Sequence, residues 1–267
     1  MMAVMTQAPL YMVAGLVVGT LVGLTGVGGG SLMTPILLLF FGQPPSVAVG
    51  TDLMFAATTK LVATASFGFS RRVDWAIVGR LLLGSAPGAA VVVGWLWHAQ
   101  RVPGAADRII SHGLAVILAL TALALVLQTP LRRLGLTFTA RWIERAERHT
   151  LALTVVAGLI LGVAVTLTSV GAGALGVVML IALYPLRLTS DRLVATDIAH
   201  ALPITLIAGA GHAFLGHVDL SVLASLLLGS IPGVLIASRL AIRLPQRLTR
   251  TCIAVMLGAV SERMLFG

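Results

Sequence analysis

Ionisable side chains are few inside the long apolar runs of the sequence. The candidates among them are Asp52, Lys60, Arg80, Asp197, His200 and His212. Apolar runs of this length are typical of membrane helices, and an ionisable group at membrane depth is costly enough to be a functional candidate by default. Arg80 and His212 lie nearer the ends of their runs, where a polar end residue or a side chain reaching the membrane boundary explains them as well.

Lys60 is the most informative of these residues. It lies more than two turns into its run and has Thr58 and Thr59 beside it. A buried ammonium group needs an anionic partner, and here the partner could be Asp52 or a bound substrate. The residue type therefore predicts either an internal ion pair or an anion-binding site.

Asp197 and His200 are three residues apart, so they would share one face of a helix. Histidine titrates near neutral pH, and the pair could relay protons or could equally be a structural pair. Asp52 and Asp197 each lie near the expected start of a helix, where a carboxylate could cap backbone N–H groups. Handling of protons or cations fits these aspartates as well as capping does, and both roles could coexist.

Clustered small residues interrupt two of the apolar runs, at 26–31 (Gly-Val-Gly-Gly-Gly-Ser) and at 169–174 (Ser-Val-Gly-Ala-Gly-Ala). Glycine is costly in a helix and readily adopts other dihedrals, so each run predicts two helical pieces around an unwound stretch. Bare backbone at membrane depth is tolerated only beside protein or a water-filled cavity. Breaks at matching positions of two halves point to a transporter's binding site. Close helix packing through glycine is the structural alternative.

The composition is that of a polytopic membrane protein. The 267 residues are 58% hydrophobic and only 10% charged, with a mean hydropathy of +1.04, whereas a soluble domain carries about 25% charge. The net charge of +9 could suggest nucleic acid, but the arginines lie in short loops between apolar runs, which is the positive-inside pattern. A single cysteine, Cys252, excludes an internal disulfide and a Cys-rich zinc site. No Lys or Arg precedes Lys60, so we expect the first run to be a retained helix and not a signal peptide.

Ten apolar segments predict an all-α fold. They are 9–25, 31–42, 47–69, 75–97, 109–128, 150–168, 174–184, 193–215, 220–242 and 249–266. Two of them, 31–42 and 174–184, fall short of the roughly 20 residues needed to span a bilayer, so each could be half of a re-entrant hairpin. An arginine-rich linker, 131–149, separates a first transmembrane repeat (1–130) from a second (150–267).

Four sequence motifs recur in the same order in both halves. The matches are Ala14–Gly30 with Ala157–Gly173, Ala48–Asp52 with Leu193–Asp197, Val73–Trp75 with Val218–Leu220, and Gly84–Gly88 with Gly229–Gly233. Lys60 falls opposite Thr205, so the repeat itself does not require the charge. Where a loop of one half is basic, the equivalent loop of the other half is neutral. For example, Arg71 and Arg72 precede Val73, whereas Gly216 and His217 precede the equivalent Val218. This exchange predicts inverted halves, with the linker in the cytoplasm and both termini outside.

Signatures of soluble enzymes are missing: there is no His-Glu-x-x-His motif, no P-loop lysine motif and no G-x-S-x-G elbow. The glycine run at 26–30 partly mimics a dinucleotide-binding loop, but a membrane helix stands where that loop needs a strand. We therefore predict neither an enzyme nor a bound cofactor.

Residues 23–35 (Gly-Leu-Thr-Gly-Val-Gly-Gly-Gly-Ser-Leu-Met-Thr-Pro), followed by the motifs at 48–52 and 84–88, resemble the sulfite exporter TauE/SafE family. The resemblance extends over nearly the whole chain and is most specific in the first half. It implies a multi-pass permease of the cytoplasmic (inner) membrane that moves sulfite, organosulfonates or related sulfur anions. The second half departs from the motif at Ala172, Ala174 and Val178, which stand for a glycine, a serine and the proline.

The physical properties of the residues and the family resemblance both favour a small oxyanion as substrate. Helix N-termini offer free N–H groups, and Lys60 adds a full positive charge. The predicted substrate site comprises Gly26, Gly28, Gly29, Gly30, Ser31, Thr51, Lys60, Gly171 and Gly173. The predicted proton-coupling residues are Asp52, Asp197 and His200, and no metal site is predicted. The expected partners are the sulfur oxyanion and the lipid bilayer, without nucleic acid.

Two other functions compete with this one. The first is a cation or metal-ion permease with Asp52, Asp197, His200 and His212 as ligands. The second is an intramembrane enzyme or an assembly scaffold, which no motif supports.

Overall fold

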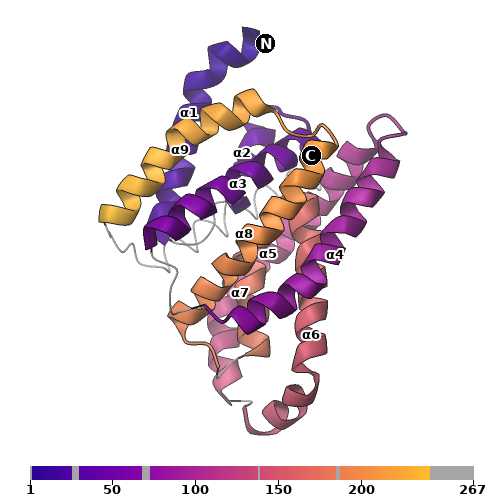
Figure 1. Cartoon of the computed structure of the whole chain (residues 1–267), viewed down its shortest axis with the longest axis vertical. Coiled ribbons are helices and arrows are strands. Elements are labelled where there is room, and N and C mark those ends of the chain that lie inside the picture. Colours follow the sequence, from indigo (N-terminus) through magenta and orange to yellow (C-terminus); the bar gives the residue numbers. More distant parts are fainter. Residues whose placement is uncertain (1, 26–29, 68–72, 138, 185–186, 241–267) are drawn as a thin grey trace.

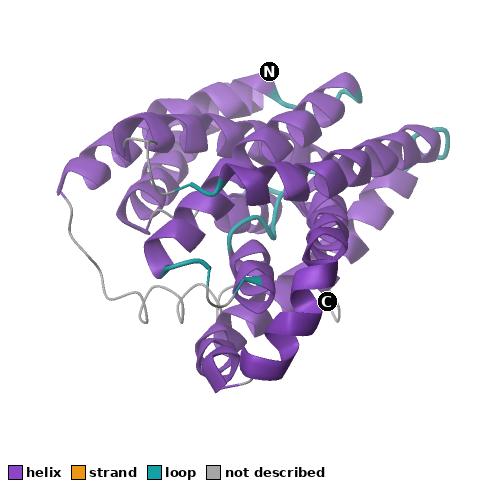
Figure 2. Cartoon of the chain, turned by 60° about the horizontal axis from the view of Figure 1, so that its bottom comes forward, coloured by secondary structure: helices purple, strands orange, loops and turns teal. Residues whose placement is uncertain are grey.

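The computed structural model describes residues 2–25, 30–67, 73–137, 139–184 and 187–240, and within these ranges the only regular secondary structure is helical (Figures 1 and 2). The helices are α1 (Met2–Thr25), α2 (Gly30–Leu39), α3 (Pro45–Phe67), α4 (Trp75–Ala99), α5 (Ala105–Thr137), α6 (Thr139–Thr168), α7 (Ala174–Leu183), α8 (Ser190–Phe214) and α9 (Leu220–Leu240). The all-α prediction is confirmed. The tenth predicted segment and Cys252 lie outside the described residues.

Five of the helices are long and apolar enough to cross a membrane. The stretches concerned are Trp75–Ala99, Ala105–Ala124, Thr150–Thr168, Arg192–Phe214 and Leu220–Ala237. The helices α2 and α7 have 10 residues each, which corresponds to about 15 Å, half of a hydrocarbon core. Both short segments are therefore half-length helices, as their sequences predicted. The linker at 131–149 is helical as well, since α5 continues to Thr137 and α6 begins at Thr139.

Glycine brings two helix pairs into close backbone contact. A Cβ placed on these glycines would collide with backbone atoms of the facing helix. The contacts are Gly15–Leu226 and Gly19–Ser230 between α1 and α9, and Gly158–Leu81 and Gly162–Ser85 between α6 and α4. In both helix pairs the two glycines are four residues apart, and so are the residues that they contact. The two helices of each pair run in the same direction. Small residues allow this approach in an apolar environment, where packing drives association.

The two central helices, α3 and α8, lie side by side and antiparallel. Gly50, near the start of α3, lies against His212 and His217 at the end of α8, while Gly209 lies against Leu53 and Met54. These two helices contain the matching motifs at 48–52 and 193–197. Helices with equivalent sequences therefore run in opposite directions through the middle of the molecule.

Two threonines join the halves through equivalent hydrogen bonds. The backbone N–H of Asp219, just before α9, donates to Oγ1 of Thr51 (3.0 Å), and the N–H of Asp74, just before α4, donates to Oγ1 of Thr196 (3.1 Å). Each aspartate also caps the helix that follows it: Oδ1 of Asp74 accepts from the N–H of Ile77 (3.3 Å) and Oδ1 of Asp219 from that of Val222 (3.1 Å). These caps satisfy N–H groups at the helix starts. The matching motifs thus play matching structural roles.

The two caps differ in their charged partners. Arg187 donates to both carboxylate oxygens of Asp74, through Nε to Oδ2 (2.9 Å) and Nη2 to Oδ1 (3.1 Å). Such forked pairs are geometrically specific. Asp219 instead accepts from the N–H and hydroxyl of Ser221. Partial burial would raise the pKa of Asp219, but these hydrogen bonds outweigh that effect and hold it below its usual value. Among the described residues, an arginine ion pair is therefore present at the Asp74 cap and not at the Asp219 cap.

Apolar clusters enclose the middle of α3. Met33, Leu37 and Phe55 pack with residues of α1 and α9, and on another side Val49 and Leu53 pack with residues of α4, α5 and α8. The polar residues of α3 lie between these clusters, away from bulk solvent.

Candidate functional site

The predicted unwound stretch is present in the second half. The helix α6 ends at Thr168 and α7 begins at Ala174. Between them the backbone takes positive φ angles at Ser169 (58°), Gly171 (113°) and Gly173 (127°), a region that glycine enters without steric cost. In the first half, Gly26, Gly28 and Gly29 lie outside the described residues, and Gly30 and Ser31 open α2.

The start of α7 has free hydrogen-bond donors. The N–H groups of Gly176 and Val177 donate to the carbonyls of Gly171 (3.2 Å) and Gly173 (3.1 Å). Within the described part of the chain, the N–H groups of Ala174 and Leu175 have no backbone acceptor. Unpaired N–H groups and the helix dipole make such an end attractive to negative charge.

Asp52 is fully buried in α3, and it binds α2. Its Oδ2 accepts hydrogen bonds from the backbone N–H (3.1 Å) and the hydroxyl (2.5 Å) of Thr34. It lies about two turns into its own helix and so does not cap the start of that helix. The Ser169 hydroxyl faces the carboxyl from the α6–α7 break. Its position does not meet the geometry of a hydrogen bond, and among the described residues both Asp52 Oδ1 and Ser169 Oγ are buried without a hydrogen-bond partner.

Lys60 is buried in the same helix, with 3% of its surface exposed. The hydroxyls of Thr58 and Thr59, its sequence neighbours, donate hydrogen bonds to backbone carbonyls of α3 and not to Lys60. Lys60 makes no ion pair at 4.0 Å or less with any described residue. It lies within electrostatic range of Asp197 and Asp52, and the effect of Asp197 is the larger. Both carboxylates therefore act on the ammonium group electrostatically, and neither forms an ion pair with it at 4.0 Å or less.

Asp197 and His200 share one helix, α8, but they have different surroundings. The Asp197 carboxylate lies against Gly176 in the first turn of α7, where even a Cβ would collide with Oδ1. His200 shares a hydrogen bond of 2.9 Å between its Nε2 and the hydroxyl of Ser85 on α4. Both residues are buried, with 5% and 1% of their surfaces exposed. Like Asp52, Asp197 lies too far into its helix to cap its start.

The structure therefore assembles the predicted coupling residues around Lys60. Asp52, Asp197 and His200 all lie near it, although they come from helices far apart in sequence. The α6–α7 break reaches Asp52 through Ser169, and α7 reaches Asp197 through Gly176. Gly171 and Gly173 belong to the same break and are buried.

Sequence reasoning missed three hydroxyl-bearing residues of this cluster: Thr34, Ser169 and Ser85. Thr34 belongs to the motif at 23–35 and Ser169 to the interrupted run at 169–174, so both were within reach. Ser85 belongs to the repeated motif at 84–88, but its pairing with His200 could not be predicted, because it joins residues that are far apart in the sequence.

Thr51, Arg80 and His212, which the sequence also singled out, make specific contacts elsewhere. Thr51 accepts the N–H of Asp219, as described above, and Arg80 donates from Nη1 to the Tyr184 hydroxyl (3.5 Å). His212 donates from Nε2 to the Thr166 carbonyl (2.9 Å), which leaves its Nδ1 to accept from Nδ1 of His217 (3.3 Å).

Gln100 completes this histidine chain, since its Nε2 lies 2.8 Å from Nε2 of His217. Burial lowers the pKa of His217, opposed by the charge of Asp107, and this favours the neutral form that the hydrogen bonds require. Among the described residues there is no group of three or more His, Cys, Asp or Glu side chains that could hold a metal ion.

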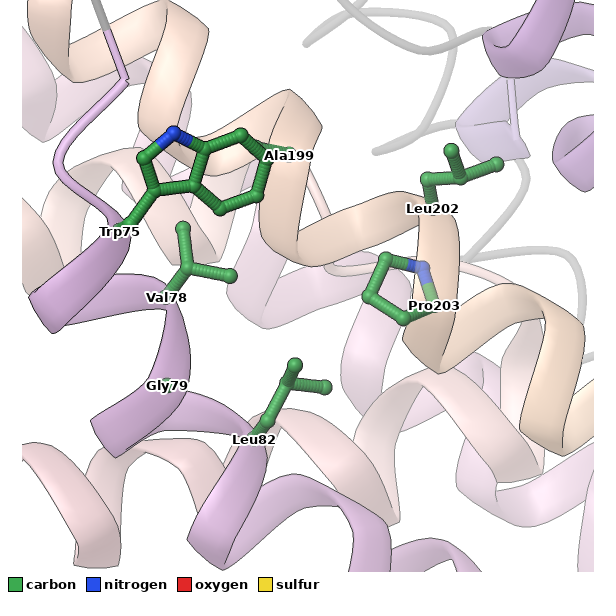
Figure 3. Close-up of a pocket in the computed structure, with 7 residues that line it drawn as sticks. All are labelled: Trp75, Val78, Gly79, Leu82, Ala199, Leu202 and Pro203. Atoms are coloured by element: carbon green, nitrogen blue, oxygen red, sulfur yellow. The ribbon is translucent and has the colours of Figure 1, made fainter.

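An open groove of about 480 Å³ lies between α4 and α8 and is nearly all apolar (Figure 3). Its lining residues are Trp75, Val78, Gly79, Leu82, Ala199, Leu202 and Pro203. None of these side chains carries a charge that could hold an anion. The buried polar cluster around Lys60 is therefore the better candidate site.

Comparisons with known proteins agree with this architecture. The family described as sulfite exporter TauE/SafE matches residues 11–264. The chain is 40% identical over 234 residues to the probable membrane transporter protein YjnA of Bacillus subtilis (strain 168), which covers 87% of this chain and 90% of that protein. It is 38% identical over 89 residues to the probable membrane transporter protein YunE of the same organism, covering 32% of this chain and 33% of that one.

A third relative is the probable membrane transporter protein of Xylella fastidiosa (strain 9a5c), 30% identical over 73 residues that make up 27% of this chain and 28% of the relative. No solved structure matches the chain significantly. Multiple apolar helices, an interrupted helix beside buried charges and a family match over nearly the full length all lead to one conclusion. The chain is a multi-pass membrane transporter, not an enzyme, and belongs to the sulfite exporter TauE/SafE family.

Proposed function

We propose that this transporter moves small sulfur-containing anions, such as sulfite or organosulfonates, across the cytoplasmic membrane by ion-coupled alternating access. The observation that carries the proposal is Lys60, a buried lysine with no ion pair at 4.0 Å or less among the described residues. A buried charge without a close partner is unfavourable. A bound anion would supply the missing partner.

The substrate site proposed here combines Lys60 with backbone donors. The N–H groups of Ala174 and Leu175 follow the break that contains Gly171 and Gly173. In the first half, the glycines at 26, 28, 29 and 30 together with Ser31 would supply the equivalent donors. A small oxyanion has several acceptor oxygens, so it would use the directional N–H donors and the ammonium charge at the same time. Thr51 stays at the edge of this site, because its hydroxyl already accepts the N–H of Asp219.

The charges around Lys60 supply a reason for ion coupling. With Asp52 and Asp197 both ionised, the two carboxylates outnumber the single ammonium and the cluster carries a net charge of −1. An anion would then be repelled from a buried site of low dielectric constant. Binding of a proton or another cation to one carboxylate would remove this repulsion. Proton movement through Asp197 and His200 is our leading candidate for that coupling, with Asp52 as the second carboxylate.

Alternating access would follow from inverted halves. The antiparallel contact of α3 with α8, whose sequences are equivalent, supports an inverted arrangement with the site at the interface of the two repeats. Rocking of one repeat against the other about a fixed central site is the common mechanism in transporters of this kind. The ion pair of Asp74 with Arg187 would break and re-form in each cycle.

A cation permease is the alternative, and the described residues favour the anion. They contain no group of three or more His, Cys, Asp or Glu side chains, which a transported divalent metal ion would need as ligands. In addition, the ammonium of Lys60 would repel a second cation placed beside Asp197.

The test is transport by the purified protein in liposomes, with labelled sulfite compared against a divalent metal ion. We expect sulfite to move and the metal not to. Lys60→Ala should raise the apparent Kd for sulfite roughly tenfold or more, since a charge-assisted hydrogen bond contributes about 1.5–3 kcal/mol. Lys60→Arg should keep part of the affinity, being charged but differently shaped.

Arg108→Ala is the matched control, because it removes an exposed cation far from α3 in the sequence. It should leave the affinity unchanged. Wild-type sulfite affinity in a well-folded Lys60→Ala protein, or faster flux of the metal than of sulfite, would refute the proposal.

A further inference from the structure

Two buried oxygen atoms, one on α3 and one at the α6–α7 break, have no hydrogen-bond partner among the described residues. Asp52 Oδ1 belongs to a residue with 0% of its surface exposed, and Ser169 Oγ to one with 2% exposed. The serine hydroxyl lies beside the carboxyl, yet neither oxygen has a partner. Buried polar atoms are nearly always satisfied, so an unsatisfied pair requires an explanation. A bound ion between the two oxygens would satisfy both.

The surrounding backbone favours a cation at this place. The helix α6 ends at Thr168, immediately before Ser169, and the C-terminal end of a helix carries a partial negative charge. Half-helix C-termini and unwound carbonyls are the groups that coordinate Na⁺ in transporters with discontinuous helices. Ser169 reaches the carboxyl from a backbone with φ of 58°, the one positive φ at a described residue other than glycine.

Comparison with the equivalent aspartate shows that this arrangement is specific to Asp52. Asp52 accepts two hydrogen bonds from Thr34 and lies beside Ser169, whereas the sequence equivalents of Thr34 and Ser169 in the other half are Val177 and Gly26. No hydroxyl is therefore available to Asp197 from those positions. Lys60 has one positive charge and lies within electrostatic range of both carboxylates. It cannot balance both when they are ionised, and the unpartnered Oδ1 identifies Asp52 as the carboxylate with a free oxygen for another cation.

We propose that Asp52 Oδ1 and Ser169 Oγ are ligands of a monovalent cation, Na⁺, bound at the α6–α7 break. Oxygen ligands suit a hard cation, and the single carboxylate argues against Ca²⁺ or Mg²⁺, which favour more oxygen ligands and higher ligand charge. The coupling role of the ion rests on the function proposed above. With Na⁺ on Asp52 and Lys60 beside Asp197, the cluster is neutral and can accept an anion.

The test is equilibrium binding of radioactive ²²Na⁺ to the purified full-length protein, without sulfite. Wild type should bind it saturably, and Asp52→Asn should abolish saturable binding. Ser169→Gly should raise the Kd for Na⁺ roughly tenfold. Because glycine accepts a φ of 58° without strain, this variant deletes the hydroxyl while favouring the native backbone.

Ser230→Ala is the matched control, since Ser230 Oγ is likewise buried and unpartnered but lies on α9. It should bind Na⁺ as wild type does. Absence of saturable ²²Na⁺ binding by wild type, or unchanged affinity in Ser169→Gly, would overturn the proposal.

The same preparations separate this site from the proposed transport function. Sulfite flux by a protein that does not bind Na⁺ would refute the cation site alone. Saturable Na⁺ binding, lost in Asp52→Asn, by a protein that does not move sulfite would refute the transport function alone.

Discussion

At the residue scale, the two equivalent aspartates differ in what stabilises them. Asp52 receives two hydrogen bonds from Thr34, whereas Asp197 lies against a glycine of α7 and near the ammonium of Lys60. A shared sequence motif therefore supports two different chemical environments. One carboxylate is held by hydroxyl and amide donors, and the other depends on charge.

The neighbours of Asp197 lead to a prediction about pH. Asp197→Asn and His200→Gln should each flatten the pH dependence of sulfite transport, because each removes a titratable group from the buried cluster. The measurement is initial flux in liposomes across a series of external pH values. His98→Gln is the control, since His98 is an exposed histidine bonded to its own helix, and it should keep the wild-type profile. If both cluster variants also keep that profile, Asp197 and His200 are structural residues.

The sequence could identify the ionisable residues that the structure buries, but not how they pair. Lys60, Asp52, Asp197 and His200 stand out because an apolar run makes a charge conspicuous. Their partners are ordinary serines and threonines, which occur throughout membrane helices without special meaning. Ser85 pairs with His200 across 115 positions of sequence, and a separation of this size is set only by helix packing.

At the element scale, the glycines fall into two classes that the sequence does not separate. Those at 171 and 173 have positive φ angles and unwind the backbone, whereas those at 15, 19, 158 and 162 are helical and let neighbouring helices touch. Both uses of glycine were predicted as alternatives for the interrupted runs. The structure has both, in different segments of the same runs.

This division predicts opposite effects of the same substitution on stability. Gly158→Ala should destabilise the protein by about 1–3 kcal/mol, because its Cβ would collide with the backbone of Leu81. Gly94→Ala is the matched control, also within a helix, where a Cβ meets nothing within 4 Å. It should stabilise by about 0.4–1 kcal/mol through lower entropy of the unfolded chain. Unfolding in mixed detergent micelles measures both, and equal effects would contradict the packing argument.

At the scale of the whole molecule, the order and type of the helices follow from the sequence, while their lengths follow only in part. The apolar segments at 75–97, 174–184 and 220–242 correspond closely to α4, α7 and α9. The segments predicted at 109–128 and 150–168 belong to the longer helices α5, which extends to Thr137, and α6, which begins at Thr139. Hydropathy detects membrane depth and not helix ends, so a polar helical extension is invisible to it.

The direction of the molecule in the membrane is a separate prediction. We expect the linker at 131–149 to face the cytoplasm and both termini to face outside, because arginines concentrate in the loops assigned to the cytoplasm. Single cysteines at Thr137 and at Gln7, in a Cys252→Ala background, would be tested with an impermeant thiol reagent on intact cells. Gln7→Cys should be labelled and Thr137→Cys should not. The reverse pattern would overturn both the orientation and the inverted repeat.

The helix α1 packs against α9, and α4 packs against α6, so each pair joins helices from opposite halves of the chain. This arrangement affects the order in which the protein assembles during synthesis. The helix α1 leaves the ribosome long before the surface that it packs against, which belongs to α9 (Leu220–Leu240). Until α9 is inserted, the glycine face of α1 is in contact with lipid or with another protein. A chain truncated before α9 would leave that face uncovered. The contact between α1 and α9 therefore forms late in the insertion of the described helices.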